Sequence, residues 1–151
     1  MNAYEACERH VVTVRRHEEL STAAWMMRER DVGCLVVVDP VEGMGGWVPV
    51  GFISDREIVT SVIARDCDPR NVNIEDVMEQ HPITVRDTTS LEDALQALRA
   101  SRVRRIVVVD EHGRLAGILT RDDIFDHLTQ RTPKAVPPGR RESRRLAAAG
   151  S

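Results

Sequence analysis

Two stretches of the chain place a hydroxyl residue three positions before a carboxylate, in GFISDREI (51–58) and GILTRDDI (117–124). The pairs are Ser54 with Glu57 and Thr120 with Asp123. At a helix start, such groups can hydrogen-bond to otherwise unpaired backbone N–H groups. A helix start also suits a phosphate, and a carboxylate can accept two hydrogen bonds from vicinal sugar hydroxyls. From the residues alone, helix capping and a nucleoside phosphate site both stay open.

The two stretches close the copies of an internal repeat. Residues 2–39 align with 73–110, with 14 identities in 38 positions. Beyond Asp39 the offset falls from 71 to 66, so that Gly51 aligns with Gly117 and the first copy carries five extra residues. These lie in PVEGMGGWVPV, whose glycines are typical of a surface loop. A repeat of this kind predicts two supersecondary units that bury their apolar faces together.

Each copy predicts the order strand, helix, strand, strand, helix. Apolar residues at i, i+3, i+4 and i+7 indicate an amphipathic first helix in each copy. These residues are Leu20, Ala23, Ala24 and Met27, then Leu91, Ala94, Leu95 and Leu98. The β-branched runs at 35–38 and 106–109 favour strands covered on both faces, and residues 111–114 predict a tight turn. We expect the closing helices to face inward through Ile58, Val59 and Val62 and through Ile124, Phe125 and Leu128.

Composition bounds the class of protein. With 151 residues, 42% hydrophobic and 30% charged, the chain is globular and holds one domain or two small units. No apolar run of 18 residues exists and the first ten residues are too polar for a secretory signal, so we expect a cytoplasmic protein with no membrane partner. Three cysteines without C-x-x-C spacing and five histidines without ligand spacing predict neither a disulfide framework nor a metal site.

Charge separates an acidic body from a basic tail. Residues 131–151 hold six basic residues against one glutamate, a net of +5, so the whole-chain charge of −3 leaves −8 for residues 1–130. We expect this tail to be disordered or weakly helical and to have no specific nucleic-acid partner. We therefore divide the chain into a first repeat (2–66), a linker with a short helix (67–79), a second repeat (80–130) and the tail (131–151).

The doubled order of motifs resembles a tandem pair of cystathionine β-synthase (CBS) domains, the Bateman module. The segments that carry the resemblance are VVTV and PITV, VGCLVVVD and VRRIVVVD, and the two closing phrases. The resemblance implies an α/β fold in which two pseudo-symmetric β-α-β-β-α repeats pack as one module. It also implies two clefts for an adenosine compound (AMP, ADP, ATP, S-adenosylmethionine or NAD), a homodimer, and regulation of an effector protein. It brings no catalytic activity and no catalytic cofactor.

Carried over residue by residue, the resemblance implies one nucleotide site in each copy. Thr120 and Asp123 would bind ribose and phosphate in the second copy, where Gly117 would let backbone approach closely. The rest of that site would be Ile83, Thr84, Val85, Val103, Arg104, Arg105 and Ile106. The first-copy site would comprise Ser54, Glu57, Val12, Thr13, Val14, Val32, Gly33, Cys34 and Leu35.

The two copies differ at residues that bear on binding. Glu57 stands where the family usually has aspartate, which could shift or abolish ribose binding. The second copy has Arg104 and Arg105 where the first has Gly33 and Cys34, and two guanidiniums attract a polyphosphate. We therefore expect the Thr120/Asp123 site to be the stronger. A solvated rim of paired surface charges is the other interpretation of these arginines.

A ligand sensor has two alternatives, an interaction scaffold and an enzyme. A ligand-free interaction scaffold would use the Gly-rich loop at 40–49, with Trp47 exposed as a contact. An enzyme has no support, because the sequence shows no nucleophile elbow, no P-loop and no paired catalytic carboxylates.

Overall fold

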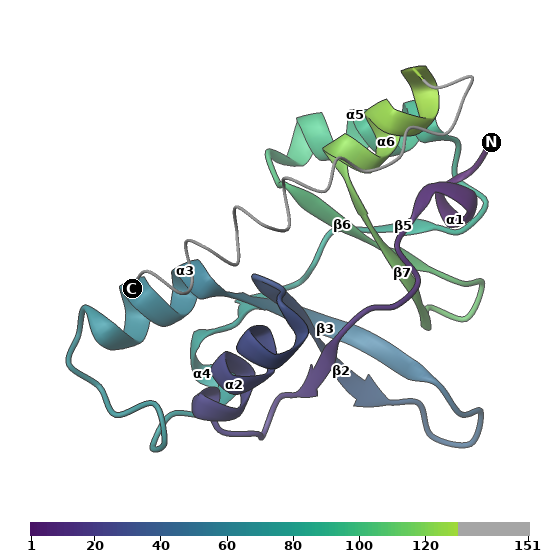
Figure 1. Cartoon of the computed structure of the whole chain (residues 1–151). Helices are drawn as coiled ribbons and strands as arrows, with labels where there is room; N and C mark the ends of the chain where they lie inside the picture. The colour runs from purple at the N-terminus through teal and green to yellow at the C-terminus, as the bar shows by residue number, and fades with distance from the viewer. Residues whose placement is uncertain (130–151) are drawn as a thin grey trace.

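The computed structural model describes residues 1–129, in which two small β-sheets pack together and are flanked by helices (Figure 1). The elements are α1 (Ala3–Ala6), β1 (Thr13–Arg15), α2 (Leu20–Arg30), β2 (Cys34–Pro40), β3 (Trp47–Ser54), α3 (Asp55–Ile58), the π-helix η1 (Val59–Ile63), α4 (Ile74–Val77), β4 (Glu79–Gln80), β5 (Thr84–Arg86), α5 (Leu91–Ser101), β6 (Arg105–Val109), β7 (Leu115–Thr120) and α6 (Arg121–Thr129). The tail expected at 131–151 lies outside the described residues.

Both sheets share one topology, which confirms the predicted α/β repeat. In the first repeat (β1 to η1), β1 runs parallel to β2 and β2 antiparallel to β3. In the second repeat (β5 to α6), β5, β6 and β7 are related in the same way. The strand orders are β1-β2-β3-β4 and β5-β6-β7. The register shifts at equivalent places, between Val37 and Val38 and between Val108 and Val109.

The central strands β2 and β6 are buried on both faces, as predicted. Leu35 and Val37 of β2 pack into the core that holds α2, while Val36 and Val38 face the opposite sheet. In β6 the same alternation occurs, because successive side chains of a strand point to opposite faces. The core between the sheets comprises Val36, Val38, Phe52, Val107 and Val109. This apolar layer joins the two repeats.

The first helices bury their predicted stripes almost completely. In α2, Leu20, Ala23 and Met27 are buried, while Ala24 is exposed. In α5, Leu91, Ala94 and Leu98 are buried, with Leu95 packed against the same core. The α5 N-terminus is capped by the Ser90 side chain, which accepts a hydrogen bond from Asp93 N–H at 3.2 Å.

The closing helices bury fewer apolar residues than predicted. Val62 and Ile124 are fully buried and Ile58 packs against the first core. Val59, Phe125 and Leu128 are 52%, 40% and 44% exposed, so their inward orientation was predicted wrongly. A helix that covers one side of a core buries only one stripe, and apolar residues beside that stripe remain in contact with solvent.

The segment that leads into each repeat packs on the other repeat. Ala3 and Ala6 of α1 lie in the core with Leu91 and Leu98, and Figure 1 shows α1 beside β5 and β7. Reciprocally, Ile74 of α4 lies in the core of the first repeat. The predicted short helix of the linker is therefore present, and it completes the first core.

Hydrogen bonds repeat this exchange at equivalent positions. Ala3 N–H donates to the Thr89 carbonyl at 2.7 Å, and Ile74 N–H donates to the Glu18 carbonyl at 3.0 Å. Asn2 N–H donates to the Glu5 carboxylate and Asn73 N–H donates to the Asp76 carboxylate at the equivalent places, and the Asn2 side chain also accepts from Glu5 N–H. The two halves of the fold thus hold each other by matched contacts.

Candidate functional site

A pocket of about 480 Å³ lies between the two repeats. The first repeat contributes the end of β3 and the start of α3, and the second contributes the entry to β6. The segment 79–83, which leads from β4 into β5, closes the third side. The lining residues are Cys34, Phe52, Ser54, Asp55, Arg56, Glu57, Glu79, His81, Pro82, Ile83, Ser101, Arg102, Val103, Arg104 and Arg105.

The first-repeat wall is a helix start whose polar groups are already paired. Glu57 accepts a hydrogen bond from Ser54 N–H at 2.9 Å and another from the Ser54 hydroxyl. This is the capping arrangement that the sequence left open. Cys34 lies opposite Ser54 in the β2–β3 ladder, so both side chains point to the same face of the sheet.

The second-repeat wall is rich in guanidinium groups. α5 ends at Arg102, which adopts a left-handed conformation with φ of 55°. This turn redirects the chain into Val103, the exposed Arg104 and the half-buried Arg105. A ligand in the pocket would therefore meet an apolar side chain and three cationic side chains on one wall.

Charges from both repeats act on Cys34. Burial raises the pKa of the Cys34 thiol to about 11; among the charged groups, Arg105 lowers that pKa while Glu57 and Asp55 raise it. The arginines of the second repeat and the carboxylates of the first repeat line the same pocket. The pocket is thus bipolar, with acids from the first repeat facing arginines from the second.

Thr120 and Asp123 form their own capping arrangement and are not among the residues that line this pocket. Asp123 accepts hydrogen bonds from Thr120 N–H at 2.9 Å and from its hydroxyl at 2.8 Å, and the hydroxyl accepts one from Asp123 N–H at 3.2 Å. Arg105 lies opposite Thr120 in the β6–β7 ladder. The side chains of Arg105 and Thr120 therefore point to the same face of their sheet.

Close backbone approach at Gly117 involves the chain itself. A Cβ atom there would lie 2.3 Å from Cys7 Sγ and 2.9 Å from the Glu8 carbonyl oxygen. Gly51 is its equivalent, and its Cβ would lie 2.7 Å from the Glu79 carbonyl oxygen. Both glycines make room for the leading segments that pack on them. The sequence predicted that a ligand approaches the backbone at Gly117, and in the structure Cys7 and Glu8 lie there.

The remaining predicted site residues are distributed between the cores and the surface. Val14, Leu35 and Ile106 are buried, Thr13 is half-buried, and Gly33 lies against the Asp55 side chain. Among the rest, Val85 packs against the second core and Thr84 lines a different pocket.

The grouping of residues also differs from the sequence expectation. The pocket brings Arg104 and Arg105 together with Ser54 and Glu57, whereas the sequence assigned the arginines to the Thr120/Asp123 site. The expectation missed Phe52, His81, Pro82 and Arg102, which also line the pocket. Of these residues, only His81 was marked in the sequence, because it is the repeat equivalent of His10. That equivalence does not show which repeat the side chain faces.

The described residues hold neither a metal-binding cluster nor a membrane-spanning helix. Within residues 1–129, no group of three or more His, Cys, Asp or Glu side chains is arranged to hold a metal ion. Over the same part of the chain, every helix is too short or too polar to cross a bilayer.

Comparison with known proteins matches both repeats. The family model described as "CBS domain" matches residues 3–64 and 74–130. The chain is 32% identical over 120 residues to Hypoxic response protein 1 of Mycobacterium tuberculosis, covering 80% of each protein. It is also 32% identical over 121 residues to an uncharacterised protein of Methanopyrus kandleri, covering 80% of this chain and 59% of that protein.

Solved structures share the fold. A crystal structure of Hypoxic Response Protein I with two coordinated zinc ions has a TM-score of 0.70 at 30% identity, covering 84% of this chain and 98% of that one. CBSX2, a CBS-pair protein of Arabidopsis thaliana, in complex with AMP has a TM-score of 0.66 at 27% identity, covering 84% and 95%. A CBS domain protein of Pyrobaculum aerophilum complexed with AMP has a TM-score of 0.69 at 25% identity, covering 82% and 89%.

Proposed function

The chain belongs to the CBS domain family as a tandem pair of repeats, and from this premise we propose that it is a non-catalytic regulatory module that binds an adenosine nucleotide. The observation that carries the proposal is the pocket lined by Ser54 and Glu57 on one side and by Val103 to Arg105 on the other. Two related structures contain AMP, which supports an adenosine ligand.

The walls of the pocket suit different parts of a nucleotide. Ile83 and Val103 offer apolar surface to a base, and Arg104 and Arg105 offer guanidinium groups to phosphates. Glu57 would accept hydrogen bonds from ribose hydroxyls, in competition with the cap that it forms with Ser54. Thr120 and Asp123 remain a second candidate site for a ribose, and Arg105 lies opposite Thr120 in the β6–β7 ladder.

Regulation follows if the ligand prefers one arrangement of the repeats over another. The pocket is built from both repeats, so a ligand that contacts both walls stabilises one relative position of them. This difference in free energy can be passed to an effector protein. We place the protein in the cytoplasm, which its three free thiols favour.

A homodimer is part of the proposal, because the closing helices expose apolar side chains. Val59, Ile63, Phe125 and Leu128 are 40–63% exposed on η1 and α6. Light scattering should give about twice the chain mass of 17.0 kDa. A species at the chain mass alone, unchanged by Phe125→Ser, would remove the dimer from the proposal.

Calorimetric titration tests the ligand. Purified protein is titrated with AMP, ADP, ATP, S-adenosylmethionine and NAD, and Arg104→Gln is compared with Arg99→Gln, an exposed arginine of α5 outside the pocket. We expect Arg104→Gln to weaken binding about tenfold, more for ATP than for AMP, and Arg99→Gln to leave it unchanged. A ligand at 100 times its Kd should also stabilise the fold by about 2.7 kcal/mol.

The alternative is a ligand-free interaction scaffold built on the β2–β3 hairpin. Met44 and Trp47 of this hairpin are 53% and 41% exposed, and the Arg15 guanidinium lies 5.1 Å from the Trp47 ring. No heat with any of the five ligands, from protein that is folded by circular dichroism, would favour the scaffold over the sensor.

A further inference from the structure

A second pocket, of about 650 Å³, lies where β3, α4 and the start of β5 meet. Its lining includes apolar surface from Pro49, Val50 and Met78 and two carboxylates, Glu75 and Asp76. The nucleotide proposal makes no use of this pocket. We name it the α4 pocket.

The pseudo-symmetry of the fold shows what fills the equivalent place in the other half. Glu75 and Gln80 of the α4 pocket correspond to Tyr4 and Arg9 at the offset of 71. There the Arg9 guanidinium lies 5.0 Å from the centroid of the Tyr4 ring. An aromatic ring and a guanidinium thus meet at the equivalent place, where the α4 pocket has a carboxylate and an amide.

The charges of the α4 pocket favour a cation. Its one arginine, Arg16, is engaged by Asp39 through two hydrogen bonds. Glu75 and Asp76 add two negative charges, of which Glu75 has an exposed His17 ring nitrogen 3.4 Å away. An arginine side chain combines a cationic head with an apolar stem, and so it matches both the carboxylates and the surface of Val50 and Met78.

We propose that the α4 pocket is the docking site for an arginine of the chain's own segment 131–151. This segment carries Arg140, Arg141, Arg144 and Arg145, and its net charge of +5 complements the −8 of residues 1–130. Position 140 follows Thr129 by 11 residues, which can span about 36 Å. A body of 129 residues has a radius of gyration of about 14 Å, so the arginines of the segment can reach a large part of the surface around the end of α6.

Docking would be coupled to the pocket between the repeats. His81 and Pro82 line both pockets, and His81 holds a left-handed conformation with φ of 57°. A side chain bound in one pocket therefore contacts the backbone that shapes the other. By linkage, the segment and a ligand would change each other's affinity by the same factor.

The test uses the methyl group of Met78 as a probe inside the α4 pocket. The chain of residues 1–151 is labelled with ¹³C at its methionine methyl groups and measured without nucleotide, so the result does not depend on the proposed function. Arg140, Arg141, Arg144 and Arg145 are replaced together by Gln, in the wild-type background, in Glu75→Gln and in the control Glu92→Gln. Glu92 is an exposed α5 residue that does not line the α4 pocket.

We expect the arginine replacements to shift the Met78 signal in the wild-type and Glu92→Gln backgrounds and not in Glu75→Gln. Met44, in the β2–β3 hairpin, should be unaffected. An unmoved Met78 signal in the wild-type background overturns the proposal. In a second experiment, unlabelled wild-type protein is added at equal concentration to the labelled protein that lacks the four arginines. Recovery of the original Met78 signal there also overturns the proposal, because the segment would then dock between copies.

Discussion

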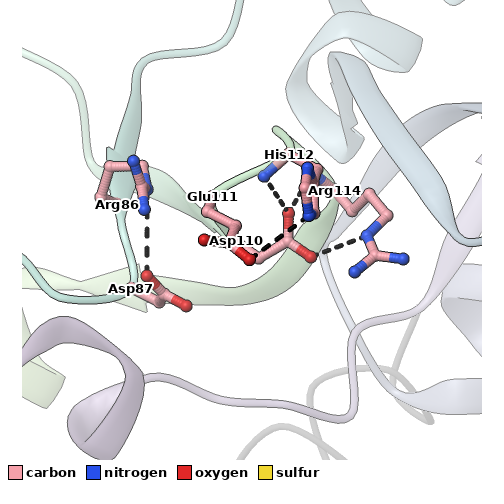
Figure 2. Close-up of polar contacts among 6 residues, drawn as sticks. All are labelled: Arg86, Asp87, Asp110, Glu111, His112 and Arg114. Carbon is pink, nitrogen blue, oxygen red and sulfur yellow. Dashed lines mark hydrogen bonds and ion pairs between the residues drawn. The ribbon is translucent and has the colours of Figure 1, made fainter.

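Arg16 and Asp87 occupy equivalent positions in the two repeats, and among residues 1–129 only Arg16 has an oppositely charged partner across its sheet. Arg16 donates hydrogen bonds to Asp39 through Nε and a terminal nitrogen. Asp87 has a buried Oδ1 atom with no hydrogen-bond partner among the described residues. The equivalent of Asp39 is Asp110, which Figure 2 shows bonded to Arg114 instead.

We predict that Asp87→Asn stabilises the protein. An unpartnered buried oxygen costs more when it carries charge than when it belongs to a neutral amide, and the difference is reduced here because the Asp87 side chain is 30% exposed. The Arg86 Nε atom, 3.9 Å from Oδ1 (Figure 2), is too distant for a hydrogen bond. Urea unfolding should show a gain of about 0.5–1 kcal/mol. Glu111→Gln removes the same charge nearby and should change little; a loss of stability in Asp87→Asn would contradict the prediction.

Asp110 should make stability depend on pH. Its pKa is lowered chiefly by the Arg114 N–H, and further by the Arg114 side chain and the His112 N–H. Because the folded pKa lies below the unfolded value, this contribution is present above the unfolded pKa of about 3.9 and is lost as pH falls through the folded pKa.

We therefore expect Asp110→Asn to unfold at lower urea concentration than wild type at pH 7, and the difference to shrink at pH 3. Glu111→Gln is the matched control, because its side chain is exposed and accepts none of these hydrogen bonds. A difference that is constant between pH 7 and pH 3 would exclude the ionised carboxylate as the cause.

Gly117→Ala should strain the contact with the leading segment. The added methyl group would overlap Cys7 Sγ and the Glu8 carbonyl oxygen, and overpacking of this kind costs about 1–3 kcal/mol. Cys7→Ala removes one of the overlapping atoms, so the double variant should lose less stability than the sum of the single variants. Additive losses in the thermodynamic cycle would show that the two side chains do not meet.

The three cysteines should differ in reactivity. The pKa of the half-buried Cys34 thiol is about 11, chiefly because its surroundings withdraw it from water, which leaves little thiolate at pH 8. Cys67 is exposed. Timed alkylation with iodoacetamide, followed by peptide mass spectrometry, should label Cys67 at least tenfold faster than Cys34. Equal rates would mean that the region around Cys34 opens readily.

Local periodicity predicted the elements and their order. The spacing after Leu20 and Leu91 placed both first helices, and the β-branched runs placed both central strands, because these patterns depend on neighbours along the chain. The orientation of Phe125 and Leu128 was predicted wrongly, since the width of a buried stripe depends on what covers the helix. Helix capping by Ser54 and Thr120 was foreseen as one of two roles, and the structure contains it.

The composition of the pocket could not be predicted in the same way. An alignment of two copies shows that Gly33 and Arg104 are equivalent, but it does not show which copy faces which. The packing between the sheets brings Arg104 toward Ser54 of the other repeat. The same ambiguity hid the exchange of α1 and α4, because the repeat pattern is identical whether a leading segment packs on its own copy or on the other.

The exchanged leading segments determine how this chain can fold. Ala3 is bonded to Thr89, and Glu8 pairs with Ile118. During synthesis Ala3 therefore cannot form its hydrogen bond before Thr89 is made, Glu8 cannot pair before Ile118 is made, and the first core is incomplete without Ile74. Contacts so distant in sequence slow folding. They also make the two repeats one cooperative unit, so a cut between residues 66 and 73 would leave each half without the segment that completes its core.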